Sequence, residues 1–216
     1  PRICRRYPVD QGGAVMVAIV DYGVGNLFSL ECSLRAIGQS VTVSGDSGVL
    51  EAADRIILPG VGAFGDAADK LRSGGLDRVL CRLAGDGKPL LGICLGMQFL
   101  MSRSFEDGEH KGLGFCAGDV VKFTAGKVPQ IGWNGVYSLR SPLFEGIGEN
   151  SEFYFVHSYY APVGENTAAA CDYGVPFSAA VWNGKNVYGV QFHPEKSGEA
   201  GLKLLRNFLK IKGVKA

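Results

Sequence analysis

The sequence lacks the features that mark several large classes of protein. Its six cysteines, among 216 residues, are scattered and form no Cys-x-x-Cys pair, which excludes a zinc ribbon or a thioredoxin-type redox motif. The formal net charge is only +1, so there is no electrostatic reason to expect a nucleic-acid or anionic-membrane partner. No apolar run approaches the length needed to span a bilayer. We therefore expect a reduced, cytoplasmic location and no membrane.

Residues 1–15 contain arginines but no hydrophobic segment of the kind found in a secretory signal. The first apolar run begins near Met16, which resembles a natural start. We therefore predict that 1–15 are an N-terminal extension, tag or leader and that 16–216 form one domain. An apolar content of 46% and a charged content of 20% are typical of a globular domain, and no repeat or linker divides it.

Apolar runs alternate with helical patterns in the first half of the chain. Strands are predicted at 17–20, 41–43, 55–58 and 89–93, and helices at 27–37, 67–83 and 95–101, the second of them interrupted at Gly74-Gly75. This order favours a parallel sheet with helices on both faces and a site at the carboxyl ends of the strands. After residue 102, short strand-like runs dominate until an amphipathic helix at 199–212. The fold class is therefore α/β with a β-rich C-terminal half.

The most informative stretch is Gly92-Ile93-Cys94-Leu95-Gly96. It joins a predicted strand to a predicted helix, which is the arrangement of a Gly-x-nucleophile-x-Gly elbow with cysteine in place of serine. At a helix N-terminus the thiolate is favoured by unpaired amides, and the amide of Leu95 is placed to face a developing oxyanion. The alternative is a buried structural cysteine.

A second chemical motif is His193-Pro194-Glu195, which follows a predicted strand. If the segment is extended, His193 and Glu195 lie side by side, because residues two apart face the same way. A carboxylate beside an imidazole holds its tautomer and stabilises the imidazolium. Together with the cysteine elbow, this pattern predicts a Cys-His-Glu triad. The alternative is a surface histidine near an unrelated glutamate, and His110 is predicted to lie in a solvated loop.

Two glycine-rich loops follow predicted strands. Pro59-Gly60-Val61-Gly62 exposes several backbone amides and is suited to form an anion-binding concavity, although an ordinary turn is the alternative. Asp21-Tyr22-Gly23-Val24-Gly25-Asn26 lacks the third glycine of a dinucleotide fingerprint, so we reject that interpretation.

These motifs together resemble the class I, or triad, glutamine amidotransferases. The cysteine elbow and Gln-Phe-His-Pro-Glu are typical of the superfamily, and the two glycine-rich loops narrow the resemblance to the glutaminase subunits of imidazole glycerol phosphate synthase. Residues 129–134 and 155–160 extend the likeness, so that it covers nearly the whole chain. One departure is Phe115-Cys116-Ala117-Gly118, where that family commonly has a proline before the glycine.

The resemblance implies a flavodoxin-like, mixed and mostly parallel sheet flanked by helices. It also implies that Cys94 attacks glutamine, that His193 transfers the proton and that Glu195 orients His193. The further residues it implies are Val61 and Leu95 for the oxyanion hole and Gly62, Gln98, Ser158 and Tyr159 for the substrate glutamine. No metal or organic cofactor is expected. The expected partner is a (β/α)₈-barrel cyclase in a 1:1 heterodimer, which docks through residues 129–134 and 157–160 unless those segments are packed in the core.

Three alternatives remain open from the sequence. The chain could serve a different synthase, such as one making anthranilate or pyridoxal phosphate. It could be a binding protein with a vestigial triad, although all three residue types are present. It could also be a cysteine-dependent hydrolase that acts alone on γ-glutamyl compounds.

Overall fold

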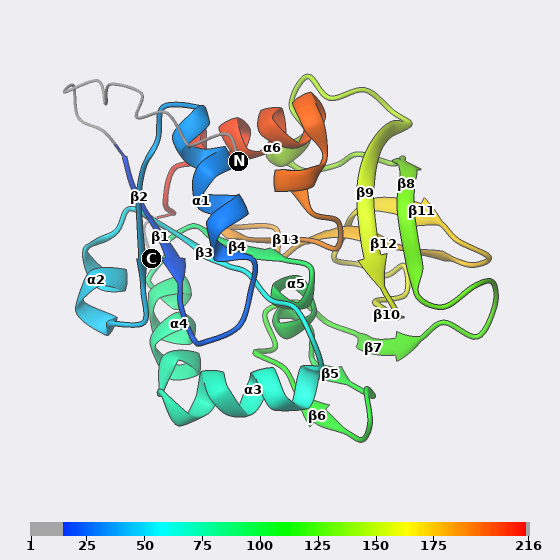
Figure 1. Cartoon of the computed structure of the whole chain (residues 1–216), viewed down its shortest axis with the longest axis horizontal. Helices are drawn as coiled ribbons and strands as arrows, with labels where there is room; N and C mark the ends of the chain where they lie inside the picture. Colours follow the sequence, from blue (N-terminus) through cyan, green and yellow to red (C-terminus); the bar gives the residue numbers. More distant parts are fainter. Residues whose placement is uncertain (1–14, 215–216) are drawn as a thin grey trace.

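The computed structural model describes residues 15–214, in which a seven-stranded sheet lies between two layers of helices (Figure 1). The predicted N-terminal extension falls outside the described residues except for Val15. No helix within the described range is long and apolar enough to cross a membrane. The strands follow the order β11 (Thr167–Asp172), β12 (Pro176–Trp182), β13 (Val187–Val190), β4 (Leu90–Ile93), β3 (Arg55–Leu58), β1 (Met16–Val20) and β2 (Ser40–Ser44).

Five neighbouring strands of this sheet, from β13 to β2, run parallel, while β12 and β11 are antiparallel additions at one edge. Strands β3, β4 and β13 are buried along their whole length. Parallel strands that are covered on both faces consist of continuous apolar residues, which is why these strands could be predicted from the sequence. The predicted mixed, mostly parallel sheet is confirmed.

The helices divide between the two faces of the sheet. Helices α1 (Leu27–Ala36) and α6 (Gly198–Lys210) cover one face, where they share a core with Val17 and Ile19 of β1. Helices α3 (Phe64–Ser73), α4 (Leu76–Gly85) and α5 (Leu95–Leu100) cover the other face, with Ala18 and Val20. Figure 1 shows the two groups on opposite sides of the strands. Alternate residues of β1 therefore face different helix layers, as the twofold period of a strand requires.

One helix was not expected from the sequence. Helix α2 (Ser47–Ala52) connects β2 to β3, and it supplies the crossover that parallel strands need. It is only six residues long and buries a single side chain, Leu50, so it has almost no helical periodicity to detect. Its N-terminus is capped by Asp46, whose carboxylate accepts a hydrogen bond of 3.0 Å from the amide of Val49.

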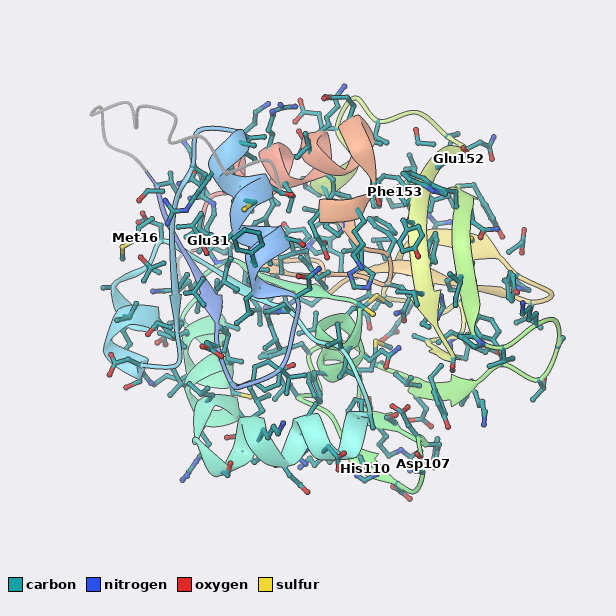
Figure 2. The ribbon with its side chains drawn as sticks, viewed as in Figure 1. Met16, Glu31, Asp107, His110, Glu152 and Phe153 are labelled. Atoms are coloured by element: carbon teal, nitrogen blue, oxygen red, sulfur yellow. The ribbon has the colours of Figure 1, made fainter. Side chains whose placement is uncertain are left out.

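The C-terminal half adds smaller β elements beside the main sheet. Strands β8 (Gln130–Val136) and β9 (Ser151–His157) form an antiparallel hairpin, and the bridge between Tyr137 and Ala170 connects it to β11. In β9 the side chains alternate: Phe153 is buried in the core and Glu152 is exposed (Figure 2). The predicted β-rich half is therefore present, partly as extensions of the main sheet and partly as separate ribbons.

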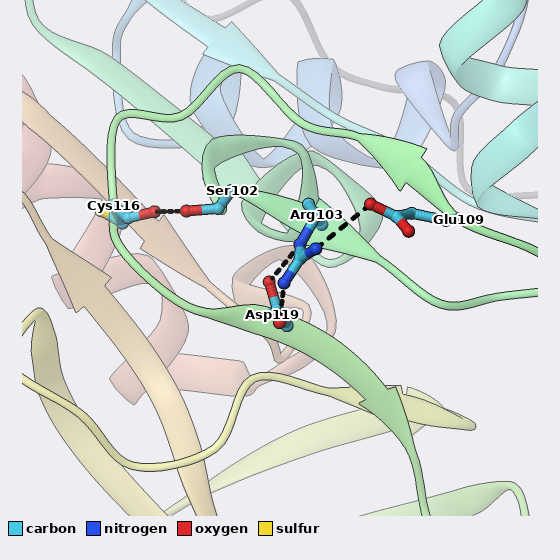
Figure 3. Close-up of polar contacts among 5 residues, drawn as sticks. All are labelled: Ser102, Arg103, Glu109, Cys116 and Asp119. Atoms are coloured by element: carbon cyan, nitrogen blue, oxygen red, sulfur yellow. Dashed lines mark hydrogen bonds and ion pairs between the residues drawn. The ribbon is translucent and has the colours of Figure 1, made fainter.

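A four-stranded sheet lies beside the start of α3. Its order is β10 (Tyr159–Tyr160), β7 (Asp119–Lys122), β5 (Arg103–Ser104) and β6 (His110–Lys111). Arg103 binds both carboxylate oxygens of Asp119, at 2.9 and 2.8 Å, and also contacts Glu109 (Figure 3). These contacts tie both ends of the 103–119 segment together.

The prediction of a solvated loop around His110 was wrong. This residue belongs to β6, is half-buried, and lies with its ring 6.0 Å from that of Phe64 at the start of α3. Figure 2 shows His110 and Asp107 beside that end of the helix. The close approach is possible because the neighbouring helix residue is Gly65, where a Cβ atom would be only 2.7 Å from the imidazole.

Candidate active site

Cys94 lies at the turn between β4 and α5 with φ 56° and ψ −113°. A positive φ is uncommon for a residue with a side chain, and at a strand-to-helix turn it is the geometry of a nucleophile elbow. The flanking glycines are required by packing. A Cβ atom on Gly92 would lie 2.5 Å from the carbonyl oxygen of Gly96, and one on Gly96 would collide with the carbonyl of Leu58. The sequence-predicted elbow is therefore present in the structure.

The neighbouring strand brings the second motif to the same place. The amide of Cys94 donates to the carbonyl of Val190, at 2.8 Å, where the parallel strands β4 and β13 end together. The chain leaving β13 contains Gln191 and His193, so both follow directly from the carboxyl end of a strand next to the elbow. Residues almost a hundred positions apart meet because a parallel sheet collects its strand ends at one edge.

His193 and Glu195 form the predicted pair. Nδ1 of His193 lies 2.8 Å from Oε1 of Glu195, and only 4% and 3% of the two side chains are exposed. The carboxylate accepts a hydrogen bond from Nδ1–H, which leaves Nε2 as the other functional atom of the ring. The expectation of an extended segment was wrong, because Pro194–Lys196 is a short 3₁₀ turn, η2. Proline suits this turn as well as an extended chain, because its fixed φ fits the first position of a helix.

The environment of His193 favours the imidazolium. Burial alone lowers the pKa of His193, but its interactions with the Cys94 sulfur and with Glu195 outweigh that effect and raise it to about 10. Among the residues that the structure describes, Nε2 makes no hydrogen bond of normal distance and angle. The Cys94 sulfur therefore lies beside the ring without a hydrogen bond of normal geometry to Nε2.

A cavity of about 260 Å³ opens over the sulfur of Cys94. Its size suits an amino-acid ligand, since pockets for drug-sized molecules begin near 300 Å³. The residues that line it are Val61, Gly62, Cys94, Leu95, Gln98, Glu106, Pro129, Val156, His157, Ser158, Tyr159 and His193. All the sequence-predicted site residues are in this set except Glu195, which lies behind His193.

The predicted oxyanion and substrate residues thus surround the cavity, but their roles stay predictions. Gly62 has φ 86°, a conformation that only glycine adopts easily. Gln98 is buried, and its Nε2 donates to the carbonyl of Tyr159 and to Oε1 of Gln191, both at 3.0 Å. Its own Oε1 is left as the atom that could accept a hydrogen bond from a ligand amide.

Three further residues next to the sulfur or the cavity had no role in the sequence-based site. Gln191 is fully buried, and its Nε2 lies 3.7 Å from the Cys94 sulfur. Glu106 reaches the cavity and accepts a 2.8 Å hydrogen bond from the amide of Phe64; burial raises the pKa of Glu106. Tyr22 donates to the carbonyl of Pro59, at 2.9 Å, and thereby holds the start of the Pro59-Gly60-Val61-Gly62 loop.

Gln191 and Tyr22 belong to the Gln-Phe-His-Pro-Glu and Asp-Tyr-Gly motifs, but these motifs assigned no role to either side chain. Gln191 is a polar residue between the apolar Val190 and Phe192, and Glu106 lies in a polar loop with no pattern. Within residues 15–214, no group of three or more His, Cys, Asp or Glu side chains is arranged to hold a metal ion.

The family model described as glutamine amidotransferase class-I matches residues 18–211. This chain belongs to the class I glutamine amidotransferases. The resemblance seen in the sequence motifs is therefore confirmed.

Individual relatives of this glutamine amidotransferase show which members of the family it is similar to in sequence. The imidazole glycerol phosphate synthase subunit HisH of Methanosarcina barkeri is 50% identical over 198 residues, covering 89% of this chain and 97% of that protein. The HisH subunit of Desulfitobacterium hafniense is 51% identical over 197 residues, covering 89% and 93%. The structure of PurLQS from Thermotoga maritima has a TM-score of 0.70 at 22% identity, covering 91% and 98%, which shows a shared fold.

Proposed function

We propose that this protein is the glutaminase subunit of an imidazole glycerol phosphate synthase in histidine biosynthesis. It hydrolyses L-glutamine to glutamate and ammonia and delivers the ammonia to a (β/α)₈-barrel cyclase in the cytoplasm, as one half of a 1:1 heterodimer. Residues 16–216 form the amidotransferase domain in this proposal. The supporting observation is the buried His193–Glu195 pair beside a cavity whose floor is a cysteine at an elbow.

The first half of the reaction forms a thioester. The thiolate of Cys94 attacks the side-chain carbonyl carbon of glutamine, and the resulting oxyanion is bound by the amides of Leu95 and Val61. The imidazolium of His193 then gives its proton to the leaving nitrogen, which departs as ammonia. Because Glu195 holds Nδ1, the transferable proton is on Nε2, which is the correct atom for both steps.

The second half releases glutamate. Neutral His193 takes a proton from water, which attacks the thioester, and the restored thiol closes the cycle. Gly62, Gln98, Ser158 and Tyr159 hold the substrate in this proposal, and Glu106 supplies a negative charge near the cavity for its ammonium group.

The hairpin formed by β8 and β9 is the proposed docking face for the cyclase. Ile131 and Trp133 are 62% and 50% exposed, although residues of these types are normally covered. They lie on β8, paired with β9, whose Val156 and His157 line the cavity. His157 and Tyr159 are themselves buried, so only part of the sequence-predicted docking segments is available to a partner.

Substitution of the nucleophile tests the proposal. Cys94→Ala should reduce glutamine-dependent product formation by the complex at least about 10³-fold, because the thioester cannot form. Synthesis from added ammonium should continue, since the cyclase performs the remaining chemistry. Retention of glutamine-dependent activity in the variant, or its absence in the wild-type complex, would refute the proposal.

The loop Pro59-Gly60-Val61-Gly62 is the proposed switch for this activity. Gly62 is in the left-handed region, and rotating a peptide plane next to glycine costs little local strain. Glutamate release should therefore rise when the cyclase and its ligand are added. Equal rates with and without them would reject gating by the partner.

A further inference from the structure

We infer that Gln191 is a positioning residue for the reacting cysteine. The side-chain amide of Gln191 donates a hydrogen bond to the Cys94 sulfur and favours the thiolate. The inference rests on the proposed glutaminase chemistry, because it concerns the same sulfur. It gives that sulfur a partner in addition to His193, and this partner has no assigned role in the triad.

Gln191 is fully buried, where a polar side chain must find hydrogen-bond partners within the protein. It follows β13 directly, is 0% exposed, and its backbone amide is already bonded to the carbonyl of Ala179 at 2.8 Å. A buried amide without partners is costly, so its side chain must be satisfied within the protein. The two partners are Cys94, 3.7 Å from Nε2, and Gln98, 3.0 Å from Oε1.

The backbone carbonyl of Tyr159 sets the direction of the hydrogen bond to the sulfur, because Gln98 connects this carbonyl to Gln191. The carbonyl oxygen of Tyr159 can only accept, so Gln98 must turn its NH₂ group toward it, at 3.0 Å. The same NH₂ group reaches Gln191, which must therefore present its oxygen to Gln98. The NH₂ group of Gln191 is left facing the sulfur, so this amide acts as a donor.

This geometry has a definite effect on the sulfur. The thiol form can donate only weakly, to the carbonyl of Val156 at 3.9 Å, whereas the thiolate accepts from Gln191. A hydrogen bond to a charged acceptor is stronger than one to a neutral acceptor, so Gln191 stabilises the thiolate relative to the thiol. It also holds the sulfur at the floor of the cavity. Neither effect depends on glutamine binding.

The test compares Gln191→Met with the wild type. Methionine has similar length but no N–H, so the pH midpoint for alkylation of Cys94 by iodoacetamide should rise by about one unit, as loss of a charged hydrogen bond implies. The modified Cys94 peptide is followed by mass spectrometry, because Cys81 is exposed and therefore accessible to the same reagent. In the complex with the cyclase, kcat should fall about tenfold at neutral pH with little change in KM for glutamine.

Two variants separate this role from simple packing. Gln191→Glu keeps the side-chain length and an oxygen toward Gln98 but places a second acceptor beside the sulfur, so its alkylation midpoint should rise at least as far. Asn186→Leu is the matched control at the other end of β13. It removes a buried amide that donates to the carbonyls of Ala84 and Lys88, at 2.7 and 2.9 Å, without contacting the site. It should lower thermal stability and leave the midpoint unchanged.

The outcomes are distinct. An unchanged alkylation midpoint in folded Gln191→Met would overturn the inference, and so would an equal shift in Asn186→Leu. Alkylation is measured on the free chain without glutamine. Failure of the wild-type complex to hydrolyse glutamine would therefore count against the proposed function, whereas the shift in midpoint would still decide the role of Gln191.

Discussion

The two walls of the cavity are built differently. One, the elbow wall, presents Cys94 and His193 to the cavity, and the buried side chains of Gln191 and Glu195 lie behind them and contact them through hydrogen bonds. The other, the hairpin wall, is formed by β8 and β9, and it leaves Ile131 and Trp133 on the surface. The elbow wall is held by hydrogen bonds within this chain, whereas the hairpin wall leaves two large apolar side chains exposed. In the proposed function, chemistry and partner recognition therefore belong to separate walls.

The largest expected effect comes from the elbow wall. Glu195→Gln should lower kcat for glutamine about 10²–10⁴-fold, because the amide can no longer hold His193 as an imidazolium with Nε2 toward the sulfur. Affinity for the cyclase should not change, as measured by titration calorimetry. Glu199→Gln, an exposed carboxylate on α6, is the control and should leave kcat intact. A normal kcat in Glu195→Gln would refute the assignment of Glu195 to the catalytic triad.

The second effect concerns His157, which is the last residue of β9 and lines the cavity. Burial lowers the pKa of His157 to about 4, while its Nδ1 donates to the carbonyl of Tyr159 at 2.8 Å. Between pH 6.5 and 4 the unfolded chain binds more protons at this position than the folded chain. The free energy of unfolding should therefore fall by about 2–4 kcal/mol as the pH drops through that range, and level off below it.

His157→Phe isolates this contribution. Phenylalanine keeps ring contacts with Phe123, Phe155 and Phe177 but cannot titrate. In urea denaturation at pH 7 and pH 4.5, the variant should lose less stability than the wild type between the two values. Equal losses in both proteins would show that His157 is not the group responsible.

The smallest effect is expected on the hairpin wall. Trp133→Ala should weaken binding of the cyclase about 10–100-fold, as truncation of a large aromatic anchor commonly does. Alkylation of Cys94 in the free chain should be unaffected. Val214→Ala is the control: Val214 is also exposed, but it is bonded to Gly87 at the opposite end of β4 from Cys94. If both substitutions weaken binding equally, the hairpin wall is not the docking face.

Much of the central fold was predictable because its signals are local. The strands β1, β3 and β4 are short apolar runs, and α1 and α6 carry leucines at helical spacing. Helix α2 was missed because six residues with one buried leucine leave no period to recognise. The position of His110 was also missed, since its burial depends on Gly65, far away in the chain.

The site divides in the same way. Cys94, His193 and Glu195 were found because each lies in a compact motif whose chemistry is encoded by neighbouring residues. Gln191 and Glu106 were not assigned roles, because their partners lie on other elements. The turn at Pro194 shows the limit of local reasoning: the pair of side chains was predicted correctly, but from the wrong backbone conformation.

The sequence by itself determined the elbow and the His-Pro-Glu pair, since each depends on residues within a few positions of one another, and several such local motifs along the chain together determined the family. Only the tertiary structure decided that Gln191 faces the sulfur and that Trp133 remains exposed while His157 is buried. The physical reason is that hydrogen-bond direction and burial depend on strand pairing and packing. These bring together groups that are far apart along the chain.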